Sequence, residues 1–147
     1  MTSTMDASMR HAQNRAEYLH NCGSTYIIHI ALKELGIASD NEGYIHARNA
    51  VLMLRENRTA TLTNGVYLAV GMLTNPKAGE KQVEQSIRNV IKKAWKDRDA
   101  HVWECYFPIG RVGRTECPSN REFLIAIVDF VELWEGFCEE VKYGKVY

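Results

Sequence analysis

Residues 64–95, NGVYLAVGMLTNPKAGEKQVEQSIRNVIKKAW, decide the fold, because they predict two helices joined by a short break. The break covers residues 74–79, where Pro76 lacks a backbone donor and disfavours helix before it, and Gly79 ends local order. The first helix is short and apolar, so we expect it to be buried on several sides. Its apolar residues are Val66, Leu68, Ala69, Val70, Met72 and Leu73. In the second helix, apolar residues at helical spacing predict one stripe packed into a core. That stripe is Val83, Ile87, Val90, Ile91 and Ala94.

The opposite stripe of the second helix is polar and cationic. It consists of Lys81, Gln85, Arg88, Lys92 and Lys96, whose steps of three and four residues place them on one outward face. Arginine can donate to both acceptors of guanine, glutamine or asparagine can pair with adenine, and lysine can meet phosphates. A buried helix, a tight turn and such a helix form the helix-turn-helix pattern. An ordinary solvated surface helix has the same spacing, so both interpretations stay open at this point.

Composition limits where nucleic acid could be contacted. The chain has 147 residues, the size of one domain with a real core, and its 18 basic and 18 acidic side chains give zero net charge. A DNA contact must therefore come from a local patch. Residues 77–98 hold seven basic and three acidic side chains, a net of +4, whereas acidic residues gather at 129–140. The charge is segregated.

The sequence predicts a cytoplasmic protein. No apolar run is long enough to span a bilayer, and the N-terminus has no signal-peptide core. The four cysteines include no C-x-x-C pair, which argues against a zinc ribbon. We interpret them as reduced, packed thiols, with two disulfides as the alternative.

Helical patterns and caps predict an all-α fold of six helices. The predicted ranges are about 25–35, 43–57, 64–73, 80–96, 100–106 and 120–141. Asp40 or Asn41 would cap the second helix and Thr63 or Asn64 the third, and Ser119 with Glu122 forms a capping box before the last. Residues 23–147 are expected to form one helix-turn-helix domain. Residues 1–22 would be a tail or a short extra helix, either frayed or ordered by a partner.

An enzyme is not expected. The five histidines have no metal-binding spacing, so neither a metal nor a cofactor is predicted. The chain also lacks a P-loop, a G-x-S-x-G motif and a cysteine with a recognisable partner motif.

Three segments, with Ala94-Trp95 after the second, resemble a known family. They are residues 43–51 (GYIHARNAV), 82–91 (QVEQSIRNVI) and 118–126 (PSNREFLIA). The chain is similar, over residues 24–136, to the C-terminal DNA-binding effector domain of stage-zero sporulation protein A, a sporulation response regulator. The resemblance implies a six-helix domain whose third and fourth helices form the helix-turn-helix, with the fourth in the major groove.

The resemblance also implies site residues and partners. The base-reading positions fall on Glu84, Gln85, Arg88 and Asn89. We assign phosphate contacts to Lys81, Lys92, Lys96 and Arg114. Double-stranded DNA is the expected partner, bound by a tandem or other homodimer, and residues 96–106 resemble the family's contact with RNA polymerase sigma factor.

The chain departs from the family pattern at several points. The family has an arginine at the position of Gln85 and a histidine at that of Asn89, so this chain is expected to read a different site. The turn is about two residues longer, and Gly79 stands where a hydroxyl cap is expected. The family's receiver domain is not expected, because 22 residues cannot form one. Control by phosphorylation within the chain is therefore not predicted.

Two main hypotheses follow from these features. The first is a sequence-specific transcription regulator, which the local +4 charge favours. The second is a protein-interaction module or antagonist that keeps the fold without binding DNA, which the neutral net charge and the missing arginine favour. A structural or phage-borne protein without retained activity is a more distant third.

Overall fold

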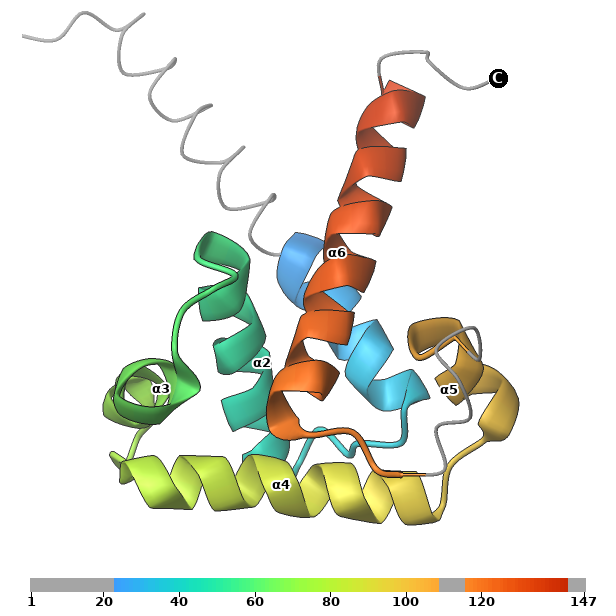
Figure 1. Ribbon diagram of the computed structural model, residues 1–147. Coiled ribbons are helices and arrows are strands. Elements are labelled where there is room, and N and C mark those ends of the chain that lie inside the picture. The colour runs from blue at the N-terminus through green and yellow to red at the C-terminus, as the bar shows by residue number, and fades with distance from the viewer. Residues whose placement is uncertain (1–22, 109–115, 143–147) are drawn as a thin grey trace, which may run out of the picture.

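The computed structural model describes residues 23–108 and 116–142, with the side chains of the last helix described through residue 137. The helices are residues 23–34, α2 (Glu42–Glu56), α3 (Tyr67–Leu73), α4 (Glu80–Lys96), α5 (Ala100–Tyr106) and α6 (Asn120–Lys142). Figure 1 shows α4 lying across one end of the molecule, with α2 and α6 on one side of it and α3 and α5 near its two ends. The described residues confirm the predicted six-helix, all-α fold. The predicted extra N-terminal helix lies outside them.

One hydrophobic core joins the helices, and α4 contributes its predicted stripe to that core. Val83, Ile87, Val90, Ile91 and Ala94 are all buried. The largest fully buried side chains from other elements include Ile28, Leu32, Leu54, Phe123 and Ile127. Each buried aliphatic side chain contributes about 1.5–3 kcal/mol relative to an exposed one, so the inner face of α4 is firmly fixed.

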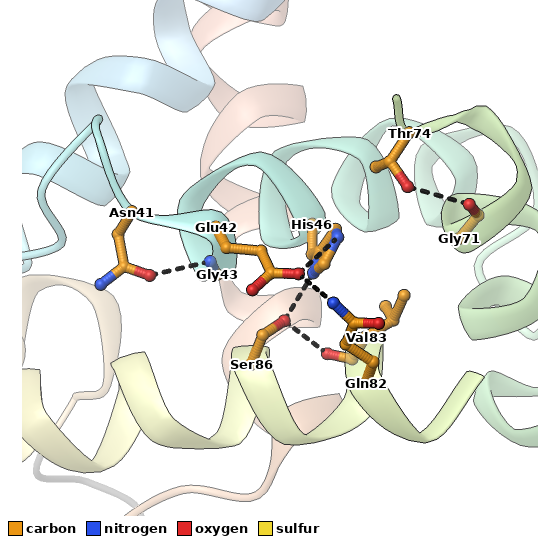
Figure 2. Close-up of polar contacts among 9 residues, drawn as sticks. All are labelled: Asn41, Glu42, Gly43, His46, Gly71, Thr74, Gln82, Val83 and Ser86. Atoms are coloured by element: carbon orange, nitrogen blue, oxygen red, sulfur yellow. Dashed lines mark hydrogen bonds and ion pairs between the residues drawn. The ribbon is translucent and has the colours of Figure 1, made fainter. Parts of the chain in front are cut away.

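Gly43 sets the distance between α2 and α4. A Cβ atom at this position would lie 2.5 Å from the carbonyl oxygen of Ser86 and 2.5 Å from a methyl carbon of Val90. Asn41 caps α2 as predicted, because its side-chain oxygen accepts the Gly43 N–H at 2.9 Å. Figure 2 shows this cap and the crossing over α4. Because Gly43 has no side chain, the first turn of α2 can pack directly against the backbone of α4.

Gly71 holds the turn between α3 and α4 in the same way. Its carbonyl accepts the Ala78 N–H at 2.9 Å. The same carbonyl accepts the Thr74 hydroxyl at 2.8 Å, a bond that Figure 2 shows. A Cβ at Gly71 would lie only 2.1 Å from the Ala78 carbonyl oxygen. The helix-turn-helix geometry therefore requires glycine at this point.

The start of α3 differs from the prediction. A π-helical turn, Leu62–Val66, precedes the helix and is defined by bonds between residues five apart, such as that from the Val66 N–H to the Thr61 carbonyl. Inside it the backbone is not helical: Thr63 is extended and Asn64 has a φ of 62°. Neither Thr63 nor Asn64 caps α3; Val66 occupies that position without a side-chain bond, so the predicted cap was wrong. The backbone N–H of Asn64 instead donates to the carboxylate of Glu80, which ties the π-helical turn to the start of α4.

The predicted burial of α3 on several sides was also wrong. Val66, Tyr67, Val70 and Gly71 are buried, but Leu68, Met72 and Leu73 are 49%, 61% and 70% exposed. This seven-residue helix packs against α4 and α2, and its opposite face is exposed. The apolar content of the sequence did not reveal which face was covered.

The predicted capping box begins α6. Ser119 Oγ accepts the Glu122 N–H, and Glu122 Oε1 accepts the Ser119 N–H, each at 3.1 Å. One face of the first three turns of α6 is buried, through Val131, and beyond that Leu133, Trp134 and Phe137 are exposed. In Figure 1 this part of α6 rises above the other helices.

Candidate nucleic-acid interface

The outer face of α4 is free of cover by the described residues. Lys81, Gln85, Asn89, Lys92 and Lys96 are all exposed, opposite the buried stripe. Because the other described helices lie on one side of α4 (Figure 1), this face forms a continuous ridge. The predicted bounds of α4 are confirmed, as is Gly79 at the N-cap without a side-chain bond.

The ridge keeps its positive charge. Within the described residues, the ion pairs that arginine forms join Arg55 to Glu135 and Arg58 to Asp129 and Glu132, far along the chain from the α4 lysines. Glu80, in the first turn of α4, accepts the Asn64 N–H, and Arg98 stacks over Trp95 at 3.6 Å. The lysines of α4 therefore face solvent without a described carboxylate to neutralise them.

Arg88 is held by the protein itself. Its guanidinium donates to the Pro118 carbonyl at 2.7 Å, to Asn120 Oδ1 at 3.3 Å and to the sulfur of Cys117, a free thiol, at 3.1 Å. Its side chain is half-buried rather than exposed. Sequence reasoning missed this role, since the partners lie 30 residues away and no local spacing indicates them.

Asn120 extends this network to three helices. Its amide nitrogen donates to the Tyr67 hydroxyl of α3 at 3.1 Å and to the backbone carbonyl of Glu84 in α4 at 3.2 Å. Burial raises the pKa of Tyr67, so its hydroxyl stays protonated. The first turn of α6 thus braces both helices of the helix-turn-helix.

The other predicted base-reading side chains lie at the surface. Gln85 and Asn89 are one turn apart, and Gln85 Nε2 donates to Asn89 Oδ1 at 2.9 Å. Glu84 is exposed on the flank of α4. Of the predicted phosphate contacts, Lys81, Lys92 and Lys96 share the ridge, whereas Arg114 lies outside the described residues.

Behind the ridge, His46 connects α2 to α4. It is 2% exposed, and its Nδ1 lies 2.5 Å from Ser86 Oγ (Figure 2). That hydroxyl also donates to the Val83 carbonyl at 2.9 Å, an arrangement that favours the neutral tautomer of His46 with its proton on Nδ1. Burial lowers the pKa of His46, and the nearby Glu42 partly opposes this effect. Sequence reasoning missed this contact, although His46 follows Gly43 by three residues on the same face of α2.

No described helix combines the length and apolar character required to cross a bilayer. Nor do the described residues bring three metal-ligating side chains together.

A buried first helix face, a tight turn and an exposed cationic second helix define a helix-turn-helix domain. The family described as Sporulation initiation factor Spo0A C terminal matches residues 28–131, more than two thirds of the chain. The chain belongs to this family, which consists of DNA-binding effector domains rather than enzymes. No curated protein matches the chain.

Proposed function

We propose that the protein is a sequence-specific transcription regulator that places α4 in the major groove of double-stranded DNA. The observation that carries this proposal is the uncovered ridge of α4, whose lysines have no described acidic partner. Helices presented in this way by a preceding helix and turn enter the major groove, where flanking cations meet phosphates. Residues 23–147 form the effector domain in this proposal, and residues 1–22 are not counted as part of it.

The ridge divides into two kinds of contact. Lys81, Lys92 and Lys96 bind phosphates, and Arg114 adds a further phosphate contact. Gln85 and Asn89 face the bases directly, with Glu84 at their flank. Arg88 reaches a base only by releasing the Pro118 carbonyl, which it binds at 2.7 Å in the free protein.

Two further partners belong to this proposal. Two copies bind in tandem or as another homodimer, and residues 96–106 contact the sigma factor of RNA polymerase. The outward side chains of α5, namely His101, Glu104 and Cys105, are exposed and available for such a contact.

Selection of bound duplexes from a random pool tests the proposal. We expect a recovered motif, and we expect its retention to fall with salt because phosphate contacts release counterions. Absence of any retained duplex at low salt would refute DNA binding.

A protein-interaction module is the second candidate. The exposed Leu133, Trp134 and Phe137 on the protruding end of α6 favour it, since grouped apolar side chains at a surface mark interaction sites. A heparin column separates the two candidates: elution at very low salt supports the interaction module, and late elution supports the regulator.

A further inference from the structure

Gln85 and Asn89 form a unit at the centre of the α4 ridge. They are exposed, lie one helical turn apart, and are joined by the 2.9 Å bond from Gln85 Nε2 to Asn89 Oδ1. Lys81 precedes Gln85 by one turn, and Lys92 follows Asn89 by three residues on the same exposed face. The amide pair therefore occupies the point where a groove would be deepest, with a cation on each side for the phosphates.

The bond between the two amides fixes what the pair offers to a ligand. The bond uses one N–H of Gln85 and one lone pair of Asn89 Oδ1. Gln85 Oε1 is left as an acceptor and the Asn89 NH₂ as a donor, and neither group takes part in the bond. Reversing both amides exchanges their atoms, but it again leaves one free acceptor and one free donor. The pair thus presents an acceptor beside a donor in either orientation.

This pattern complements adenine and not guanine. In the major groove adenine presents the N6 donor beside the N7 acceptor, whereas guanine presents two acceptors, N7 and O6. Against guanine, the free amide oxygen would face another acceptor. We infer that Gln85 and Asn89 act together as one reading unit that selects an adenine, and hence an A·T base pair, in the DNA bound by α4. This inference rests on the proposed function.

The braced Arg88 strengthens the inference. Arginine is the usual reader of guanine, but this guanidinium donates to Pro118, Asn120 and Cys117. The ridge centre consequently carries amides, not a free guanidinium. A site chosen by this face is expected to depend on adenine at the position opposite the amide pair.

The test uses the full chain and the duplex recovered from the random pool. Fluorescence anisotropy would measure its affinity for that duplex and for duplexes in which each A·T pair is replaced by G·C. For the wild type, replacement at one position should weaken binding about 5- to 150-fold, the range for one good two-bond base contact. Gln85→Ala and Asn89→Ala should each abolish this discrimination at that same position. The double variant should lose little more than either single variant, because the two side chains act as one unit.

Gln85→Arg provides a gain of function, since it should move the preference at that position from adenine to guanine. Lys92→Ala is the matched control, because it should weaken all duplexes alike and leave the preference intact. Melting temperatures of the variants check that these exposed substitutions leave the fold unchanged.

The outcomes separate the inference from the proposed function. If a motif is recovered but the amide variants weaken all duplexes alike, or alter no adenine position, the amide pair is not a reader although DNA binding stands. If the wild type retains no duplex at low salt, both fail. Loss of adenine discrimination in both single variants supports both.

Discussion

At the scale of single residues, Arg88 forms its hydrogen bonds within the protein, although its position on α4 suggests a contact with a ligand. The spacing along α4 predicts an outward-facing side chain, yet the half-buried guanidinium turns toward the segment before α6. Helical periodicity reports only which side of a helix a residue occupies. The Pro118 carbonyl comes from a distant loop, so its contact could not be predicted from that spacing.

Replacing Arg88 with alanine should destabilise the fold. The Pro118 carbonyl and the Asn120 side chain would lose a charged donor, and such bonds contribute about 1–3 kcal/mol. Urea unfolding measures the change. Lys92→Ala, which removes an exposed cation from the same helix, should stay within about 0.5 kcal/mol of the wild type. Equal stability of the two variants would show that the guanidinium is not held.

His46 should make stability depend on pH. Its pKa in the folded protein lies below the ordinary value of 6.5, because burial disfavours the charged ring. The unfolded chain then binds more protons than the folded one, so the stabilisation is complete above pH 6.5 and is lost as the pH falls toward the folded pKa. Urea unfolding at a series of pH values measures this loss. In His46→Gln, which keeps a donor for Ser86, the fall should be smaller; an identical pH profile would exclude His46 as its source.

At the scale of elements, the bounds of a helix were predicted correctly where a long apolar pattern was preceded by a helix-breaking residue. Five apolar residues between Val83 and Ala94, preceded by Gly79, fixed both bounds of α4. It failed at α3, where seven residues are too few for periodicity to distinguish a covered face from an exposed one. The positive φ of Asn64 before α3 is a local backbone choice that several residue types can make, so the sequence did not indicate the π-helical turn.

Gly71 and Gly136 should respond oppositely to alanine. At Gly71 the new Cβ would meet the Ala78 carbonyl at 2.1 Å, so the turn before α4 must shift, which we expect to cost about 1–3 kcal/mol and to weaken DNA binding. At Gly136 a Cβ meets nothing within 4 Å, and alanine in a helix should stabilise the protein by about 0.5–1 kcal/mol. Thermal unfolding of both variants compares them. A stable, fully binding Gly71→Ala protein would contradict the close approach.

For the whole molecule, the distribution of charged residues over the surface says more about a possible DNA contact than the net charge does. The chain is neutral, yet its lysines on α4 face outward, while acidic residues on α6 pair with arginines around the end of α2. Segregation of this kind was visible in the sequence, because the basic and acidic runs are far apart. The sequence did not show which basic residues remain unpaired, because ion pairing depends on how α2 and α6 pack.

The salt dependence of DNA binding should show which basic residues contact phosphates. Lys92→Ala should reduce the slope of log affinity against log salt by about one unit, because one phosphate contact is lost. Arg58→Ala removes the same charge from a residue already paired with Asp129, away from α4, and should leave the slope unchanged. Anisotropy titrations at several salt concentrations give both slopes. Equal slopes for the two variants would mean that the charge acts through the overall field and not through a contact.

The close packing of α2 against α4 at Gly43 divides α4 into an inward face that holds the fold and an outward face that does not. The inward residues of α4 are buried in the core. On the outward face, the structure describes no hydrogen bond or ion pair to another helix from Lys81, Gln85, Asn89, Lys92 or Lys96. Under the proposed function, we expect substitutions at these outward positions to retarget the protein to new operators while the fold is kept. That division makes the domain a ready starting point for engineered changes of specificity.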